Sequence, residues 1–368
     1  NRALYAVQSS SIVRISLDNI NDSISVNLDS LVISDSVGDI SQLEFYRSKD
    51  GQKKIIYLQN NSQTFSDAPI GIIDVNGNKM TVTSTSVTLM SSGFPEDMVI
   101  HSTLVDEQNY DHLYAADGVN IHAYTLDNIS QTSNTLFEKT TFSFPPKEYK
   151  MGIISETPII YNFTSYKNTL GITFSLLAGD TVPAYAGGMF FFNTLSKDYL
   201  ENPMYVFVEK QKYGNELDAK IQGFVNNGFL NEKYIILCVS EINMTTFEHI
   251  ASSVYVFTYK FAITGEIESE GREQLITTAK NPTSMLVIGD SLLVFNTPYD
   301  SNAVIDRFSL KDFTLVESID LKGIAATMSV PDNPQVLHNN DDNTSGQIFF
   351  GTSNGLVVLE FSLNPAAM

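Results

Sequence analysis

A short stretch of the chain has the residue types of a calcium-binding loop. The sequence GIIDVNGNKMTV at residues 71–82 carries oxygen-bearing side chains at every second position, namely Asp74, Asn76 and Asn78. This spacing is how the loop of a calcium-binding helix-loop-helix motif begins. Such a loop also needs a glycine at its sixth position and a bidentate glutamate at its twelfth, where this chain has Lys79 and Thr85. The pattern therefore fails at its two most specific positions.

The residues around this spacing are instead those of a β-hairpin. Apolar runs at 72–73 and 80–82 flank the pair Asn76–Gly77. Both residues of that pair reach positive φ easily, which favours a type I′ turn between two strands. We therefore predict a hairpin here and no calcium site.

One other cluster of oxygen ligands lies near the end of the chain. The sequence NNDDNTSG at residues 339–346 could bind Ca²⁺ weakly near Asp341 and Asp342. The same composition is typical of an exposed loop that ends in glycine, and this is the interpretation that we favour.

Motifs for other catalytic or cofactor chemistry are missing from the sequence. Its five histidines form no pair four residues apart, and the single Cys238 leaves no cysteine pair for structural zinc. The nucleophile pattern G-x-S-x-G and the glycine-rich loops that bind phosphates are absent too. Cys238 lies in YIILCVS, where it is expected to fill space inside a buried strand. We therefore expect no cofactor.

Composition excludes several classes of partner. The chain has 368 residues, of which 43% are hydrophobic and 17% are charged, so it is long and apolar enough to fold around a substantial core. Its net charge of −20 repels the phosphate backbone of nucleic acids and anionic membrane surfaces. No apolar run approaches the roughly 18 residues of a membrane-spanning helix. We expect neither a nucleic-acid partner nor direct insertion into a membrane.

Composition also bears on location. Few Lys and Arg residues, abundant Ser, Thr and Asn, and a lone buried cysteine suit an exported acidic protein. We therefore expect a protein outside the cytoplasm, secreted or at the cell surface. The chain starts at Asn1, so we also expect a processed form or an excised domain.

The strongest pattern in the sequence is an internal repeat. LYAVQSSSIVRISLDN from Leu4 and LYAADGVNIHAYTLDN from Leu113 align without a gap, and IFFGTSNGLVVLEFSLN from Ile348 has the same shape. Each copy is a short apolar strand, a small polar turn and an alternating strand, which is the pattern of a β-hairpin. Weaker copies begin near residues 55, 170, 234 and 292, so seven hairpins recur at spacings of 51 to 64 residues.

Additional strands complete each repeat. Runs of small or β-branched residues precede most hairpins, among them ISQLEFY from Ile40, KMGIIS from Lys150 and IAATMSV from Ile324. Further strands close several units, as in NPMYVFVEKQK from Asn202 and FTLVESIDL from Phe313. Three or four antiparallel strands per repeat, without an amphipathic helix, indicate an all-β chain built of propeller blades.

The chain therefore resembles a seven-bladed β-propeller that forms a single domain over residues 1–368. It has no tryptophan for the signature of WD40 repeats and no recurrent glycine doublet of the kelch type. Period and strand pattern are most similar to the degenerate propellers of the YVTN or quinoprotein-like kind. The first repeat opens on its hairpin and the last ends soon after one, so the strand exchange that normally closes a propeller ring is not visible.

This resemblance implies that the innermost strand of each blade lines a central channel. The polar residues expected there are Gln42, Glu44, His101, Glu156, Gln222, Ser284 and Thr327. Of these, only Glu44, His101 and Glu156 have the types of side chain that hold a metal in propeller hydrolases and lactonases. They are the catalytic candidates if the protein is an enzyme.

Two apolar stretches are expected to lie at the mouth of the channel. They are LAGDTVPAYAGGMFFFN at residues 177–193 and the inter-blade connection FSFPPKEYK from Phe142, and a second long loop begins at Ser240. The ligand-binding candidates that they provide are Phe144, Tyr149, Asp180, Tyr185, Phe190, Phe247 and His249. Exposed aromatic clusters mark binding surfaces, but the same rings could instead plug the channel or pack between blades.

These residues favour a non-catalytic binding module over an enzyme. The expected partner is a protein segment or a small molecule bound at the face around the fourth and fifth blades. A propeller hydrolase or lactonase with a channel metal is the first alternative. The second is an intracellular scaffold propeller that belongs to a larger assembly.

Overall fold

The fold is given by a computed structural model of the chain. The residues that it describes are 3–8, 11–17, 23–27, 40–47, 53–59, 70–76, 79–89, 99–103, 112–116, 120–125, 135–136, 138–143, 158–176, 185–193, 198–199, 204–207, 221–243, 245–261, 267–271, 274–278, 280–297, 302–322, 334–339, 345–352 and 355–362. All of them lie in β-strands or in the turns and short connections between strands, so the predicted all-β class is confirmed. This described part of the chain accordingly contains no helix that could span a membrane.

The chain divides into two compact units, Asn1–Ile153 and Ile154–Met368. The first unit contains three sheets with strand orders β1-β2-β3, β4-β5-β6-β7-β11 and β8-β9-β10-β12. Neighbouring strands are antiparallel except for the short β11, which runs parallel to β7. The strands are β1 (Ala3–Gln8), β2 (Ser11–Ser16), β3 (Ser23–Asn27), β4 (Ile40–Arg47), β5 (Lys53–Gln59), β6 (Ile70–Asn76), β7 (Lys79–Leu89), β8 (Val99–Thr103), β9 (His112–Ala116), β10 (Asn120–Thr125), β11 (Thr135–Leu136) and β12 (Glu138–Ser143).

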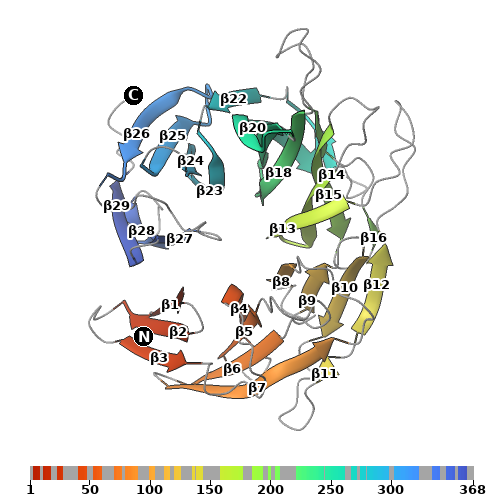
Figure 1. Cartoon of the computed structure of the whole chain (residues 1–368), viewed down its shortest axis with the longest axis vertical. Coiled ribbons are helices and arrows are strands. Elements are labelled where there is room, and N and C mark those ends of the chain that lie inside the picture. Colours follow the sequence, from red (N-terminus) through yellow and green to blue (C-terminus); the bar gives the residue numbers. More distant parts are fainter. Residues whose placement is uncertain are drawn as a thin grey trace. The chain divides into compact units, whose positions relative to one another are not determined.

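The second unit contains four sheets whose strands all run antiparallel to their neighbours (Figure 1). Their strand orders are β13-β14-β15-β16 with β17 also on β15, β18-β19-β20-β21 with β22 also on β20, β23-β24-β25-β26, and β27-β28-β29. The strands are β13 (Pro158–Tyr166), β14 (Thr169–Leu176), β15 (Tyr185–Asn193), β16 (Asp198–Tyr199), β17 (Met204–Phe207), β18 (Ile221–Leu230), β19 (Tyr234–Asn243), β20 (Glu248–Phe261), β21 (Ile267–Ser269), β22 (Gln274–Thr278), β23 (Pro282–Ile288), β24 (Ser291–Asn296), β25 (Val304–Ser309), β26 (Leu315–Asp320), β27 (Gln335–His338), β28 (Ser345–Thr352) and β29 (Gly355–Ser362).

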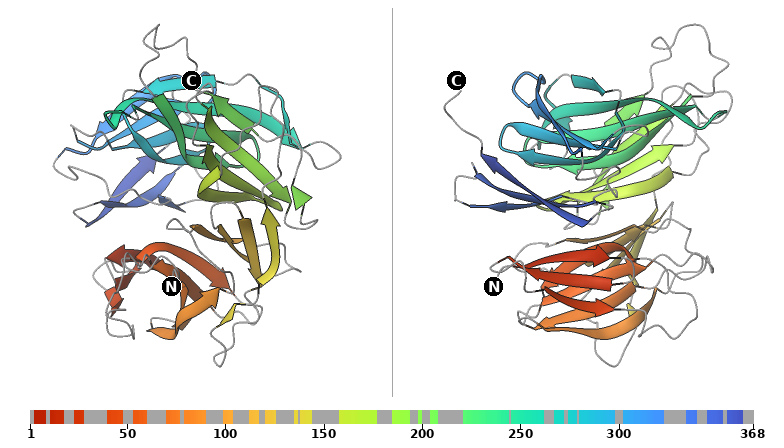
Figure 2. Two further views of the ribbon diagram at one scale, coloured as in Figure 1. Left: turned by 45° about the vertical axis from the view of Figure 1, so that its right-hand side comes forward. Right: turned by 60° about the vertical axis from the view of Figure 1, so that its left-hand side comes forward.

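Within each unit, sheets that follow one another in the chain pack face to face. In the first unit, Ile12 of β2 packs against Ile55 and Tyr57 of β5 and Ile73 of β6. In the second unit, the sheet of β18 to β22 lies between two others, as the views in Figure 2 also show. Consecutive antiparallel sheets stacked in this way are the blades of a β-propeller.

The sheet of β18 to β22, which we call the central sheet, is buried on both faces. One face of β19 presents Leu237 to the sheet of β13 to β17, where Phe191 packs against it. The next residue, Cys238, points to the opposite face and packs in a cluster with Val294 of β24. Alternate side chains of one strand thus enter two different cores. Cys238 is fully buried as predicted, and burial raises the pKa of its thiol far above the ordinary value.

The hairpins predicted from the repeat are confirmed. Those at Leu4, Leu113 and Ile348 are β1-β2, β9-β10 and β28-β29, and the weaker copies begin at β5, β14, β19 and β24. The turn predicted at residues 71–82 is also a hairpin, β6-β7, in which Asn76 pairs with Lys79. Asn76 is thus part of a strand, and the predicted turn residue Gly77 lies outside the described residues.

Two innermost strands lie elsewhere than predicted. The first strand of the fourth sheet is Pro158–Tyr166 rather than KMGIIS from Lys150, and that of the last sheet is Gln335–His338 rather than IAATMSV from Ile324. In the fourth sheet, the short turn between the first two strands explains the difference. Only Lys167 and Asn168 separate β13 from β14, so the first strand must end at Tyr166. The predicted outer strands are confirmed as β17 and β26.

The number of strands per sheet also exceeds the prediction in three cases. Two short strands share the outer position in the fourth and fifth sheets, and β11 adds a fifth strand to the second. The prediction that all sheets belong to one seven-bladed domain stays a prediction.

We expect Gly187→Ala to destabilise the second unit strongly. Gly187 has φ +137°, and an added Cβ would lie 2.1 Å from the carbonyl oxygen of Phe174. A left-handed backbone alone costs about 1–2 kcal/mol for a non-glycine residue, and the collision with a rigid backbone atom adds to it. Urea unfolding should show a loss of more than about 3 kcal/mol.

Gly355→Ala is the matched control. Gly355 has φ +125°, but nothing lies within 4 Å of its added Cβ. It should lose only the backbone term of about 1–2 kcal/mol. Equal losses for the two variants would mean that β15 does not approach β14 as closely as the structure shows.

Candidate functional site

The first strands of several sheets share a feature that the sequence did not reveal. In β4, β13, β18 and β23 the pairing with the second strand shifts by one residue at the same place, which leaves one extra residue in each first strand. The extra residues are Ser41, Tyr161, Asn226 and Thr283. A bulge of this kind re-aims the neighbouring side chains and frees backbone groups for other partners.

In the second unit, asparagines at these bulges connect consecutive sheets. Asn162 Nδ2 donates to Asn227 Oδ1 at 2.9 Å, and Asn227 Nδ2 donates to the carbonyl oxygen of Thr283 at 3.1 Å. Asn226 Nδ2 donates to Ser240 Oγ and to the carbonyl oxygen of Pro282, both at 3.0 Å. This chain of amides joins three neighbouring first strands and satisfies polar groups that the bulges leave out of the sheets.

The predicted channel metal site is only partly within the described residues. Glu44 lies on β4 and His101 on β8, as expected for first strands, but Glu156 and Thr327 fall outside the described residues. Ser284 lies on β23 with 1% of its surface exposed. Within the described part of the chain, no three His, Cys, Asp or Glu side chains gather where they could hold a metal ion.

The apolar stretch at residues 177–193 is in large part a strand rather than a loop. Its second half is β15, which pairs with β14 on one side and with β17 on the other. Phe190 is 4% exposed, and its ring stacks on Phe174 with centroids 4.3 Å apart. Phe190 is therefore a core residue and not an exposed ligand-binding residue.

Several other ligand-binding candidates lie outside the described part of the chain. Phe144, Tyr149 and Asp180 lie outside the described residues, as do Asp341 and Asp342. Tyr185 begins β15, but the described residues do not include its side chain. As binding residues they stay predictions.

The two other candidates, Phe247 and His249, lie together at the end of a long hairpin. The expected loop from Ser240 is short, because β19 continues to Asn243 and β20 begins at Glu248. Asn243 Oδ1 accepts hydrogen bonds from the backbone N–H groups of Thr245 and Thr246. We use the name hairpin tip for residues 243 and 245–250.

The hairpin tip holds one aromatic ring out into solvent. The backbone N–H of Phe247 donates to the carbonyl oxygen of Asn243 at 2.6 Å, which closes the turn with Phe247 at φ 57°. The ring is 76% exposed, and Ile250 nearby is 37% exposed. Thr246 Oγ1 also donates to Glu248 Oε2 at 3.1 Å. A local network of hydrogen bonds thus fixes the backbone on which an exposed phenyl ring is mounted.

Only two other non-glycine residues have positive φ in the described part of the chain, Lys167 and Phe313. Phe313 packs against the core cluster around Phe308 and Leu310, so burial offsets its backbone strain. Lys167 lies in the two-residue turn between β13 and β14. Phe247 combines the strained backbone with a large apolar side chain that is 76% exposed, so packing within this chain offsets little of the strain.

His249 is anchored beside the exposed ring. Its Nε2 lies 2.6 Å from Ser252 Oγ. Burial of the imidazole lowers its pKa below the ordinary value of 6.5. Ser252 is fully buried, so this serine–histidine contact cannot act as a nucleophile and base on an outside substrate. Both residues lie on β20, on either side of Ile250, where the pairing of β20 with β19 shifts by one residue.

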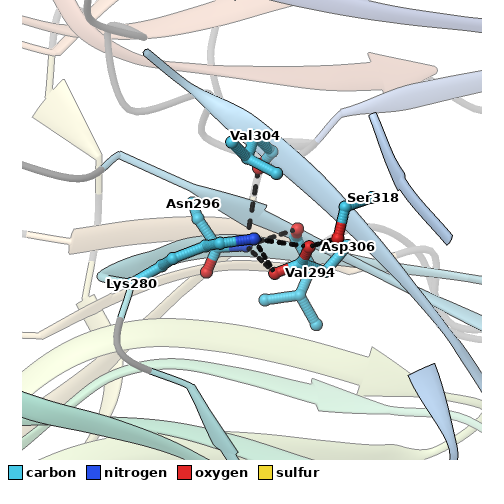
Figure 3. A network of polar contacts seen from close by, with 6 residues as sticks. All are labelled: Lys280, Val294, Asn296, Val304, Asp306 and Ser318. Atoms are coloured by element: carbon cyan, nitrogen blue, oxygen red, sulfur yellow. Dashed lines mark hydrogen bonds and ion pairs between the residues drawn. The ribbon is translucent and has the colours of Figure 1, made fainter. Parts of the chain in front are cut away.

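A second polar cluster lies in the sheet of β23 to β26 (Figure 3). Lys280 Nζ contacts both carboxylate oxygens of Asp306, at 2.8 and 3.0 Å, and Asn296 Nδ2 donates to Asp306 Oδ2 at 3.0 Å. Ser318 Oγ donates to the other oxygen. Asp306 is 3% exposed and has a donor on each oxygen, so it ties Lys280 and Ser318 together and has no free lone pair directed at a ligand.

We expect acid to weaken the hairpin tip through His249. The folded state disfavours the charged imidazole, so the unfolded chain takes up a proton at higher pH. The stability due to neutral His249 is therefore complete above about pH 6.5 and decreases as pH falls through the lower pKa of the folded state. Urea unfolding at several pH values should show this decrease in the free energy of unfolding. His249→Gln should remove the share of the decrease that His249 causes. An identical pH profile in the variant would contradict the burial of neutral His249.

Asp306→Ala should destabilise the second unit by about 2–4 kcal/mol in urea unfolding, because it strands Lys280 and two polar side chains around a vacated site. The matched control is Glu317→Ala, which breaks the exposed ion pair with Arg307 and should cost less than about 1 kcal/mol. Similar losses would show that the Asp306 cluster contributes no more than a surface pair.

Comparisons with known proteins give structural likeness alone. No family model matches the chain, and no curated protein matches it in sequence. It is similar to the N-terminal domain of Nup159, with TM-score 0.44 and 9% identity over 88% of this chain and 75% of that one. It is also similar to the β-propeller domain of the trilobed protease from Pyrococcus furiosus, with TM-score 0.42 and 8% identity over 100% of this chain and 94% of that one. For the dihydro-heme d1 dehydrogenase NirN the TM-score is 0.40 with 8% identity, and 87% of this chain covers 64% of NirN. The function of the site therefore has to be argued from its own residues.

Proposed function

We propose that this β-propeller chain is a non-catalytic interaction module that binds an apolar segment of another protein at its hairpin tip. Phe247 is the anchor of the contact, and Ile250 widens the apolar surface. The exposed aromatic side chain supplies a large contact area with little loss of conformational freedom, as side chains at the centre of protein interfaces do.

The strain at Phe247 is the observation that carries this proposal. A non-glycine residue at φ 57° costs about 1–2 kcal/mol, and glycine would adopt this backbone without that cost. With 76% of its surface exposed, the phenyl ring gains little from folding. A large apolar side chain that stays mostly exposed on a strained backbone is explained when its benefit comes from a partner.

The rigid mounting of the ring supports the same function. Asn243 fixes the turn through two backbone N–H groups, and β19 and β20 below it belong to the doubly buried central sheet. A preorganised contact of this kind avoids much of the entropy that a mobile loop would lose on binding.

Three further features belong to this proposal. We propose that the seven sheets are the blades of one propeller of the degenerate YVTN or quinoprotein-like type. The hairpin tip belongs to the fifth sheet, and we propose that the partner binds at the face around the fourth and fifth sheets. The acidic, lysine-poor composition supports a location outside the cytoplasm, secreted or at the cell surface.

Phe247→Gly should separate binding from stability. Peptides selected by phage display on the wild-type protein should bind the variant at least about tenfold more weakly, because an interface anchor is worth about 2 kcal/mol or more. The free energy of unfolding should stay the same or rise, because glycine relieves the strained φ. Fluorescence anisotropy with labelled peptides and urea unfolding measure the two effects.

The matched control is Leu315→Ala. Leu315 on β26 is 54% exposed. The substitution therefore removes an exposed apolar side chain of comparable kind that is distant in sequence from the hairpin tip. It should leave the affinity of the same peptides within about twofold. Unchanged binding to Phe247→Gly together with reduced stability would show that Phe247 serves the fold, and the proposal would be wrong.

A further inference from the structure

The sheet of β27 to β29 differs from its neighbours in its outer strand. In the sheet of β23 to β26, the third strand β25 pairs with β24 on one side and with β26 on the other. Likewise, β15 and β20 each carry an outer partner. The corresponding third strand of the last sheet is β29, which pairs with β28 over Gly355–Ser362. Among the described residues, β29 has no strand on its other edge.

The edge of β29 carries one exposed charge, Glu360, but neither a bulge nor a proline. All eight of its residues pair with β28 in register without a shift, and it contains no proline. By contrast, the outer strand β26 is interrupted at Val316, where the pairing with β25 shifts by one residue. Bulges, prolines and short strands are the usual protection of exposed edges. A long regular edge such as that of β29 is a template for another strand.

Side chains on β29 also lack cover. Val357, Leu359 and Phe361 pack against the core cluster around Phe295 and Phe350, yet they remain only partly buried. Leu356 and Val358 on the opposite face are partly exposed too. An added strand would cover apolar surface on both faces of the sheet.

The charges of the neighbouring sheets indicate what kind of strand fits. The third strand and the outer strand form cross-strand ion pairs twice in the second unit, Arg307 with Glu317 and Lys260 with Glu268. In both, the third strand supplies the cation. In β29 the exposed charge is Glu360, so the complementary residue on an incoming strand is basic.

We propose that the outer edge of β29 accepts an extended segment of another protein as a fourth antiparallel strand, with alternating apolar residues and a Lys or Arg opposite Glu360. Backbone hydrogen bonds along the edge give affinity, and Glu360 selects the basic residue. The net charge of −20 disfavours a second copy of this chain as the occupant. This surface is separate in sequence from the hairpin tip, and the inference does not depend on the function proposed there.

The test uses a short fluorescein-labelled peptide of alternating valine and threonine with one central lysine. It should bind the whole chain, and hydrogen exchange at the amides of β29 should slow on binding while that of the hairpin tip stays the same. The same peptide with N-methylated amides on its pairing edge should not bind. Replacing the central lysine by glutamate should weaken binding about fivefold, as expected for one cross-strand charge pair.

Variants of the protein make the test specific. Glu360→Lys should reverse the preference between the lysine and glutamate peptides. Glu317→Lys makes the same change in net charge on β26 and should leave the preference unchanged. Because both positions are exposed, neither variant should unfold the protein.

Three results would overturn the proposal. The first is the absence of peptide binding. The second is strong exchange protection, in the free protein, of the β29 amides that do not hydrogen-bond to β28, which would mean that another part of this chain already covers the edge. The third is a dimer in analytical ultracentrifugation that Val358→Pro dissociates, which would assign the edge to a second copy.

Discussion

The rest of the fold depends on central strands that are apolar on both faces. A sheet stacked between two others has no solvent side, so alternate residues of β19 and β24 enter different cores and both sets are mostly apolar. In β19 the core residues Leu237 and Cys238 point in opposite directions and are both fully buried. In β24 every residue is buried. In the second unit, the two faces of each of these sheets are covered by the sheets before and after it in the chain.

The same constraint explains which parts of the fold the sequence predicts. Runs such as YIILCVS and SLLVFN recur because each sheet repeats the same two-sided burial, and the hairpins could be found from them. The error at Phe190 has the same origin. GGMFFFN in β15 is a strand buried on both faces, but without visible alternation its apolar residues resemble an exposed apolar loop. A half-buried strand is recognised by its alternation of apolar and polar residues. Without that alternation, composition alone does not distinguish a buried apolar strand from an exposed apolar loop.

The bulges in the first strands could not be predicted from the sequence, for a different reason. An extra residue in a strand is visible only against its partner strand, and it appears in the sequence as one more β-branched or polar residue. Asn226 and Asn227 look like an ordinary polar pair, yet one contacts Ser240 and Pro282 and the other contacts Thr283 of the next sheet. Their amides were absent from the predicted site because the need for them arises from backbone groups that no local pattern reveals.

In the core, the local sequence and the fold agree. Phe247 and the edge of β29 are two places where they do not. At Phe247 a strained backbone supports an exposed ring, whereas at Phe313 a comparable backbone angle is offset by burial. At β29 a regular edge lacks the bulge that protects β26. In each case the contrast is with an equivalent feature of the same chain, so a general looseness of the fold does not explain it. Where the local rule is broken and the compensating contact is missing within the described chain, the compensation is expected from a partner.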